Sequence, residues 1–225
     1  MPRTARTCPG GYVYHVLNRG VGRMQLFSQP ADYDAFLEIL AETLAKHPLR
    51  LLSFCLMPNH WHFVVWPEKD RELAPFFQRL TVTHAVRWQK HRRRVGYGHV
   101  YQNRFKSFPV ETDHYFYQLV RYVERNPVRA ELVTDAVAWK WSSLWVRDQG
   151  TTDQRAWLSV WPAPCPCGWR TLVNLPQSEA ELAAIRRSVQ RGAPLGSPEW
   201  ARTTAEQMGL ESTLRPRGRP RKGAS

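Results

Sequence analysis

The stretch MPNHWHFVVW, residues 57–66, decides the fold because it combines a tight turn with an apolar run typical of a buried strand. A strand places successive side chains on opposite faces, so we expect His60 and His62 on one face and Trp61 on the other. Two imidazoles at this spacing can form part of a metal site, although a His-x-His pair on a strand is also common on ordinary sheet surface. A third ligand and a reactive group have to come from elsewhere in the chain.

The elements around this stretch predict an α+β fold. Residues 50–57 and 60–66 form two strands joined by Pro58-Asn59, which indicates a hairpin. We expect further strands at 12–18 and 104–110, a helix from Pro30 to His47, a helix from an Asp70 cap into the basic cluster at 90–94, and a helix at 113–126. This order, β-α-β-β-α-β-α, is that of a ferredoxin-like sandwich, in which an antiparallel sheet has helices packed on one face.

The sequence pattern changes after residue 145. It predicts a domain at residues 1–145 followed by a C-terminal helical and basic extension. Residues 146–177 mix turn residues with isolated tryptophans and are expected to form a connector. Within residues 178–211, short helices at 178–191 and 198–208 form either a helix-turn-helix DNA reader or an α-hairpin that pads the domain.

The tail at residues 212–225 contains Arg217-Gly218-Arg219-Pro220-Arg221. This segment resembles an AT-hook, whose arginines enter the narrow minor groove of A·T-rich DNA. A plain basic tail is the alternative.

Composition points to a polyanionic partner. Among 225 residues, 32 Lys and Arg outnumber 19 Asp and Glu, which gives a net charge of +13 and favours nucleic acid. The four cysteines form no disulfide framework, and Cys165 and Cys167 are too closely spaced for an ordinary zinc site. No signal peptide or membrane-spanning run is recognisable, so we expect a cytoplasmic, nucleoid-associated protein with no membrane partner.

The predicted helix at 113–126 offers the missing reactive group. Tyr122 and Asn126 lie four residues apart, which places a phenol and an amide on one helix face. Tyr115 lies two turns before Tyr122 on the same side and is a second candidate.

Three motifs together resemble a known family. The stretch at 57–66, the RFKS strand at 104–107 and YVERNPVRAELV from Tyr122 onward are similar to REP-associated tyrosine transposases, which belong to the HUH single-strand nucleases and single-tyrosine insertion-sequence transposases. The resemblance covers roughly residues 10–145. It implies that His60, His62 and Asn126 bind Mg²⁺ or Mn²⁺ and that Tyr122 is the nucleophile.

The resemblance also implies the reaction. Tyr122 would attack a phosphate of hairpin-forming repeat DNA and leave a 5′-phosphotyrosine and a free 3′-hydroxyl, so that strands can be rejoined without ATP. Two other functions remain open from the residues alone. One is a non-catalytic architectural or regulatory DNA binder, and the other is a metallohydrolase of RNA or DNA that uses activated water.

A basic, aromatic-rich segment predicts the nucleic-acid surface. Between Arg87 and Val110 there are seven Lys or Arg residues and no acid, interleaved with aromatic side chains that could stack on unpaired bases. Lys106 is expected to contact phosphate close to the metal. We expect single-stranded or hairpin DNA as partner and favour a monomer over a dimer. The candidate DNA-binding residues here are Arg87, Lys90, Arg92, Arg93, Arg94, Arg104 and Lys106.

Overall fold

The computed structural model describes residues 8–112 and 114–215. Its four strands form one antiparallel sheet in the order β2-β3-β1-β4. The sheet consists of β1 (Val13–Arg19), β2 (Arg50–Met57), β3 (His60–Trp66) and β4 (Lys106–Val110). Met57 pairs with His60, so Pro58 and Asn59 form the two-residue turn that the sequence predicted.

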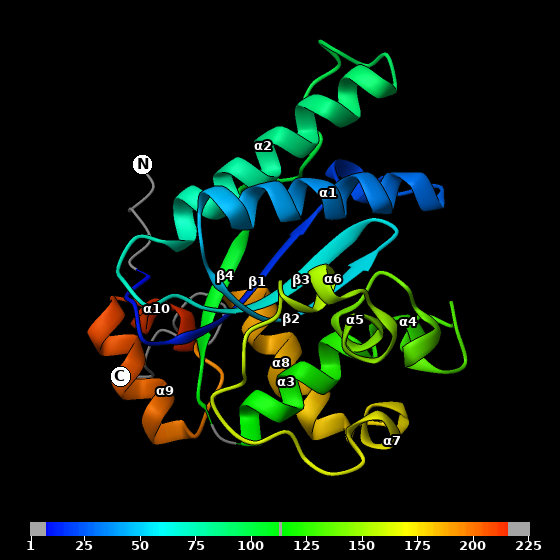
Figure 1. Cartoon of the computed structure of the whole chain (residues 1–225). Coiled ribbons are helices and arrows are strands. Elements are labelled where there is room, and N and C mark those ends of the chain that lie inside the picture. Colours follow the sequence, from blue (N-terminus) through cyan, green and yellow to red (C-terminus); the bar gives the residue numbers. More distant parts are fainter. Residues whose placement is uncertain (1–7, 113, 216–225) are drawn as a thin grey trace.

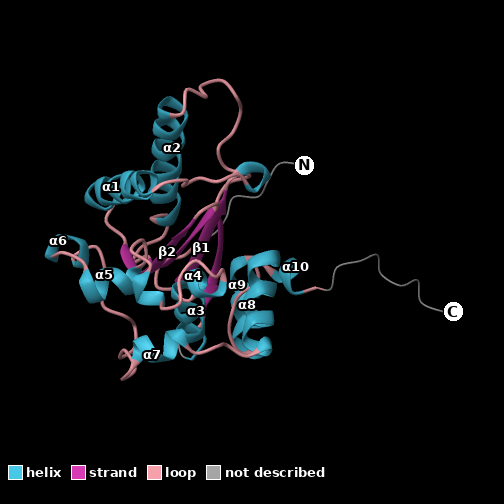
Figure 2. Ribbon diagram, turned by 90° about the vertical axis from the view of Figure 1, so that its right-hand side faces the viewer, coloured by secondary structure: helices cyan, strands magenta, loops and turns pink. Residues whose placement is uncertain are grey.

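Two long helices cover one face of the sheet (Figures 1 and 2). They are α1 (Pro30–Lys46) and α2 (Leu73–His91), which follow β1 and β3 respectively. Trp61 and Phe63 point toward them, and Phe77 of α2 packs against both rings at centroid distances of 5.8 and 5.7 Å. This arrangement confirms the predicted ferredoxin-like sandwich.

The helix boundaries follow local chemistry. Helix α1 starts with a capping box between Gln29 and Asp32, with Pro30 in its first turn. The expected Asp70 cap of α2 is wrong, because α2 begins at Leu73 and the Asp70 carboxylate accepts a hydrogen bond from Gly10 N at 2.8 Å. Asp70 therefore ties the start of the described chain to the loop that precedes α2.

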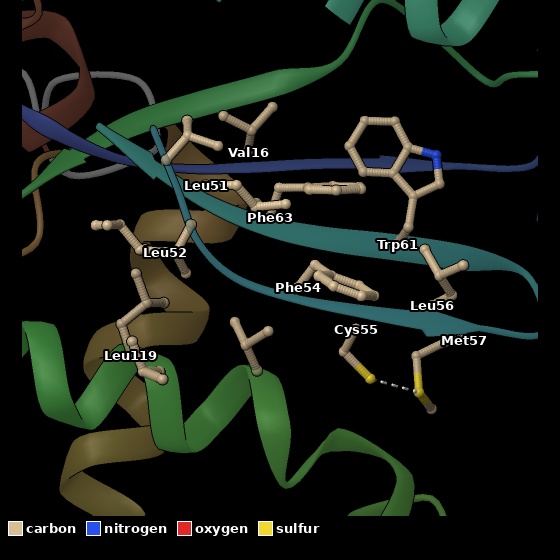
Figure 3. Packing of buried hydrophobic residues seen from close by; sticks show 14 of the residues in the cluster. Val16, Leu51, Leu52, Phe54, Cys55, Leu56, Met57, Trp61, Phe63 and Leu119 are labelled. Carbon is tan, nitrogen blue, oxygen red and sulfur yellow. Dashed lines mark hydrogen bonds between the residues drawn. The ribbon is translucent and has the colours of Figure 1, made fainter. Parts of the chain in front are cut away.

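The opposite face of the sheet is also covered, whereas the sequence predicted helices on one face. Helix α3 (His114–Glu124) lies on this face, as Figure 3 shows where Cys55 and Met57 point toward α3 and Trp61 points away from it. Two tryptophans of the expected connector, Trp161 and Trp169, pack against aromatic rings of α3. The elements that follow α3 are α4 (Asn126–Arg129), η2 (Ala136–Ala138), α5 (Ser143–Gln149), α6 (Thr152–Arg155) and α7 (Trp169–Asn174).

The connector is anchored through a buried carboxylate. Glu124, the last residue of α3, has no exposed surface. Its Oε1 accepts from Ser143 Oγ at 2.6 Å and from Arg147 Nη1 at 3.2 Å, and its Oε2 accepts from Trp169 Nε1 at 2.8 Å. Residues 146–177 are therefore bound to the helix that carries Tyr122.

The C-terminal helices form where the sequence predicted them. Helix α8 (Glu179–Arg191) is capped by Ser178, and α9 (Pro198–Met208) is capped by Ser197 and followed by Gly209 at a φ of 64°. The residues between them bind the edge of the sheet, because Leu195 N donates to Pro109 O and Leu195 O accepts from Glu111 N, both at 2.9 Å. This link attaches the segment between α8 and α9 to the edge strand β4.

The remaining elements are a short helix, α10 (Glu211–Leu214), and a short 3₁₀ turn, η1 (Val21–Arg23). Within the described ranges no helix is long and apolar enough to span a membrane. The AT-hook-like residues Arg217, Arg219 and Arg221 lie outside the described residues.

Candidate active site

The sheet presents His60 and His62 on its α3 face. In the register of β1 and β3, Arg19 pairs with His60 and Leu17 pairs with His62. His62 is almost fully buried, whereas His60, at the start of the strand, is partly exposed. Their ring centroids are 4.9 Å apart, so the two side chains share one face as the strand alternation predicted.

Each of these histidines has its Nδ1 atom in a hydrogen bond. His60 Nδ1 lies 2.6 Å from Asn59 Oδ1, and His62 Nδ1 lies 2.8 Å from Nε2 of His15. His15 comes from β1 and is fully buried. In both histidines the nitrogen outside these bonds is Nε2.

Tyr122 of α3 lies against this pair of strands. Its ring is perpendicular to the His62 ring at a centroid distance of 5.9 Å and to the His15 ring at 6.5 Å. The second candidate, Tyr115, is only partly buried and its ring lies 4.0 Å from that of His114. Tyr122 is therefore the tyrosine that the fold brings to the histidines.

Arg129 connects Tyr122 with Asn126. Its Cζ lies 4.1 Å from the centroid of the Tyr122 ring, and its Nη2 donates to Asn126 Oδ1 at 2.7 Å. Asn126 opens helix α4, because Pro127 has no N–H to continue α3 and its ring disfavours a regular helix before it. Among the described residues, Asn126 Nδ2 is buried and has no hydrogen-bond acceptor.

Burial keeps the histidines neutral. Desolvation, followed by the charges of Arg19 and Arg129, lowers the pKa of His60 to about 3. Desolvation also lowers the pKa of His15 to about 3 and that of His62 well below its usual range. Metal binding requires an unprotonated imidazole nitrogen, so these shifts suit a ligand role.

The donor set fits a divalent cation with open coordination positions. In the described part of the chain, no group of three or more His, Cys, Asp or Glu side chains could hold a metal ion, so a site at His60 and His62 would need a third ligand of another residue type. The Asn126 Oδ1 atom uses one lone pair toward Arg129 and has a second available. Two imidazole nitrogens and one amide oxygen suit Mg²⁺ or Mn²⁺ better than a closed zinc site.

A family model matches about half of the chain. A family model described as "Transposase IS200 like" matches residues 10–126, which contain both histidines, Tyr122 and Asn126. The chain belongs to the IS200-like transposase family. This membership confirms the resemblance to tyrosine transposases that the motifs indicated.

A solved structure with a TM-score above 0.5 supports the fold of this chain. A REP-associated tyrosine transposase bound to a REP hairpin has a TM-score of 0.52 and 19% identity, over 67% of this chain and 87% of that one. A "putative transposase" from Deinococcus radiodurans R1 has a TM-score of 0.39 and 18% identity, over 55% of this chain and 94% of that one. The search of curated proteins found no match.

The predicted basic surface of the transposase is only partly available to a ligand. Figure 1 shows the C-terminal end of α2 and the following loop extending away from the sheet. On this extension Arg87 forms an ion pair with Glu42 at 2.8 Å and Arg92 forms one with Asp32 at 2.6 Å. The side chains of Lys90, Arg93, Arg94 and Arg104 are exposed.

Lys106 and two of the aromatic residues in this segment make contacts inside the protein. Lys106 lies on the same sheet face as His62, and its Nζ donates to Val189 O of α8 at 3.2 Å. Trp88 and Phe108 are core residues, so they cannot stack on bases, whereas Tyr97 is 76% exposed and can.

The sequence reasoning missed two side chains that contact the site. His15 stands in the strand expected at 12–18, to which no site residue was assigned, and Arg129 lies beyond the end of the helix expected at 113–126. For His15 the available signal was its place on a strand next to the His60–His62 strand. For Arg129 the available signal was its position seven residues after Tyr122, which corresponds to two helical turns.

Proposed function

We propose that this transposase is a metal-dependent single-stranded DNA endonuclease and strand transferase. In this proposal it cleaves and rejoins hairpin-forming repeat DNA through a 5′-phosphotyrosine on Tyr122. The observation that carries the proposal is the contact of the Tyr122 ring with His62, next to Asn126 and Arg129.

The proposed reaction exchanges one phosphoester bond for another. Tyr122 Oη loses its proton and attacks phosphorus, and the bond from phosphorus to the 3′ oxygen breaks. The 3′ oxygen takes up a proton and becomes a free hydroxyl, while the 5′ phosphate stays bound to the tyrosine. Attack by a DNA 3′-hydroxyl reverses these steps and joins strands without an external energy source.

The residues around Tyr122 have separate tasks in this proposal. His60, His62 and Asn126 would hold Mg²⁺ or Mn²⁺, which supplies Lewis-acid polarisation of the scissile phosphate. Arg129 places a guanidinium where negative charge develops. The unpartnered Asn126 Nδ2 can donate to a phosphate oxygen, which would satisfy this buried group.

The proposed substrate is single-stranded or hairpin DNA. The exposed Lys90, Arg93, Arg94 and Arg104 can neutralise phosphates, and Tyr97 beside Arg94 offers a stacking surface. The solved REP-associated transposase is described as bound to a REP hairpin, which supports the same class of ligand here. We further propose that the protein acts as a monomer on DNA in the cytoplasm and that the tail adds A·T-rich minor-groove binding.

A covalent-trapping experiment tests this function. Hairpins with single-stranded flanks, labelled 5′ or 3′ of the cleavage point, are incubated with the full chain and Mn²⁺ and run on denaturing gels. We expect the label on the 5′-phosphate side to stay with the protein and the other label to be released. Cleavage without any protein-linked label would indicate the metallohydrolase, and hairpin binding without cleavage would indicate a DNA binder.

A further inference from the structure

Two polar side chains, those of Asn59 and His15, each form a hydrogen bond with Nδ1 of one of the two site histidines. We propose that Asn59 and His15 are positioning residues: Asn59 holds His60 with its proton on Nδ1, and His15 accepts the Nδ1 proton of His62 when a divalent cation binds, so that both rings then present Nε2 to the cation. This inference rests on the proposed metal site. It concerns two residues that would not touch the substrate or the cation.

The orientation of Asn59 determines the tautomer of His60. The Asn59 side-chain Nδ2 donates to Arg23 O at 3.3 Å, so its Oδ1 is the atom that faces His60. An amide oxygen can only accept, so His60 Nδ1 must carry the proton. The lone pair of the neutral ring then lies on Nε2.

The turn that carries Asn59 is held by backbone hydrogen bonds. Asn59 O accepts from Gly20 N at 2.9 Å, and Pro58 O accepts from Leu26 N at 2.8 Å and from Phe27 N at 3.0 Å. The amide is therefore attached to a fixed segment. The ring of His60 is oriented before any cation binds.

His15 and His62 share one proton between two buried rings. If His62 Nδ1 carries it, His15 Nε2 accepts, and the neutral His15 ring then has its own proton on Nδ1. If His15 Nε2 carries it instead, His62 has its proton on Nε2 and cannot bind a cation there. The first arrangement is the only one of the two that suits a metal ligand.

Which of the two proton arrangements forms depends on whether a cation is bound, because of the environment of His15 Nδ1. His15 Nδ1 is buried and has no hydrogen-bond partner among the described residues. A proton on that atom is unfavourable because a buried N–H without an acceptor loses its hydration. We therefore expect His62 to carry its proton on Nε2 without a cation and on Nδ1 with one, whereas His60 keeps its proton on Nδ1 in both states.

Calorimetric titration of the full chain with Mn²⁺ tests the role of His15. His15→Gln keeps a polar atom near the position of Nε2, whereas His15→Asn keeps one near Nδ1. Because removal of such a partner typically costs 10- to 100-fold in metal affinity, we expect this loss for His15→Asn and His15→Leu and near wild-type affinity for His15→Gln. Asn59→Ala should lose affinity in the same range, and thermal melting verifies that each variant is folded.

Nuclear magnetic resonance of ¹⁵N-labelled histidine supplies the second readout. Long-range ¹H–¹⁵N spectra with and without Mg²⁺ report which ring nitrogen carries the proton. We expect the His62 proton to move from Nε2 to Nδ1 when Mg²⁺ binds. A cation-bound protein in which His62 keeps its proton on Nε2, or equal affinities of His15→Gln and His15→Leu, would overturn the inference. Failure of the wild-type chain to bind Mn²⁺ would instead refute the proposed metal site.

Discussion

The guanidinium of Arg129 lies over the ring of Tyr122, 4.1 Å from its centroid, and donates to Asn126 at the same time. One cation thus contacts both the proposed nucleophile and a proposed metal ligand. In the reaction, negative charge would gather on the tyrosine oxygen and on phosphate. A fixed positive charge at this position is the type of group that stabilises such a transition state.

Substitution of Arg129 should therefore reduce the rate more than the affinity. Arg129→Ala is expected to lower single-turnover cleavage by about 10²- to 10³-fold, the usual effect of removing a preorganised charge-stabilising donor. Arg129→Lys should recover part of this loss, because it keeps the charge but not the planar contact. Wild-type cleavage by Arg129→Ala would mean that the stacking on Tyr122 is only structural.

The choice between the two tyrosines is tested by matched variants. Tyr122→Phe should abolish cleavage and the covalent adduct while hairpin affinity stays nearly unchanged, because only the phenolic oxygen is lost. Tyr115→Phe is the control and should retain both activities. Inactivity of Tyr115→Phe together with an active Tyr122→Phe would show that the wrong tyrosine was chosen.

The metal site makes a separate prediction. His60→Ala and His62→Ala should each remove Mn²⁺ binding and cleavage together, since each takes away a nitrogen that the other ligands cannot replace. The exposed His99 provides a control, and His99→Ala should bind Mn²⁺ normally. Calorimetric titration of the three variants decides the matter, and unchanged binding in both His60→Ala and His62→Ala excludes the site.

The sequence predicted the strands and helices in which apolar residues recur at regular spacing. It did not predict features that depend on contacts between residues distant in the chain. Strand alternation placed His60 and His62 on one face, and the four-residue spacing placed Tyr122 and Asn126 together. The short helices after residue 142 have too few residues for a visible period, and the contacts of Trp161 and Trp169 with α3 join residues distant in the chain. Asp70 looked like a helix cap, but Gly10, 60 residues away, binds its carboxylate.

The same limit explains the missed site residues. Nothing local marks His15 as a partner of His62, because their contact depends on the pairing of β1 with β3. The contact of Arg129 with the site was missed for a different reason. The proline after Asn126 predicted the end of the helix, whereas backbone bonds such as Arg129 N to Arg125 O continue the helical path for one more turn.

A buried histidine outside the site predicts how stability depends on pH. His84 Nδ1 lies 2.8 Å from Tyr101 Oη, and burial lowers the pKa of His84 to about 3. The unfolded chain, with a histidine pKa of about 6.5, binds this proton more readily between those two values. The free energy of unfolding should therefore rise with pH from about 3 to 6.5 and lose this dependence above 6.5.

Two asparagine variants isolate the contribution of His84. His84→Asn should reduce the slope of unfolding free energy against pH by up to about 1.4 kcal/mol per pH unit, the value for one proton. His99→Asn, at an exposed position, should leave the slope unchanged. Urea denaturation at several pH values measures both slopes, and identical slopes in the two variants would contradict the role of His84.

The last prediction concerns Glu124, which lies between Tyr122 and Asn126 but faces the connector. Glu124→Gln removes the charge that Arg147 requires and places an amide donor among hydroxyl, indole and guanidinium donors. Breaking a buried ion pair at one partner typically costs about 3–5 kcal/mol, and we expect the low end because Arg147 is partly exposed. Cleavage should fall as well, because the connector no longer fixes α3.

Glu42→Gln, which breaks the exposed pair with Arg87, is the matched control and should change urea denaturation little. If Glu124→Gln proves as stable as Glu42→Gln, the buried network does not hold the tyrosine helix on the sheet.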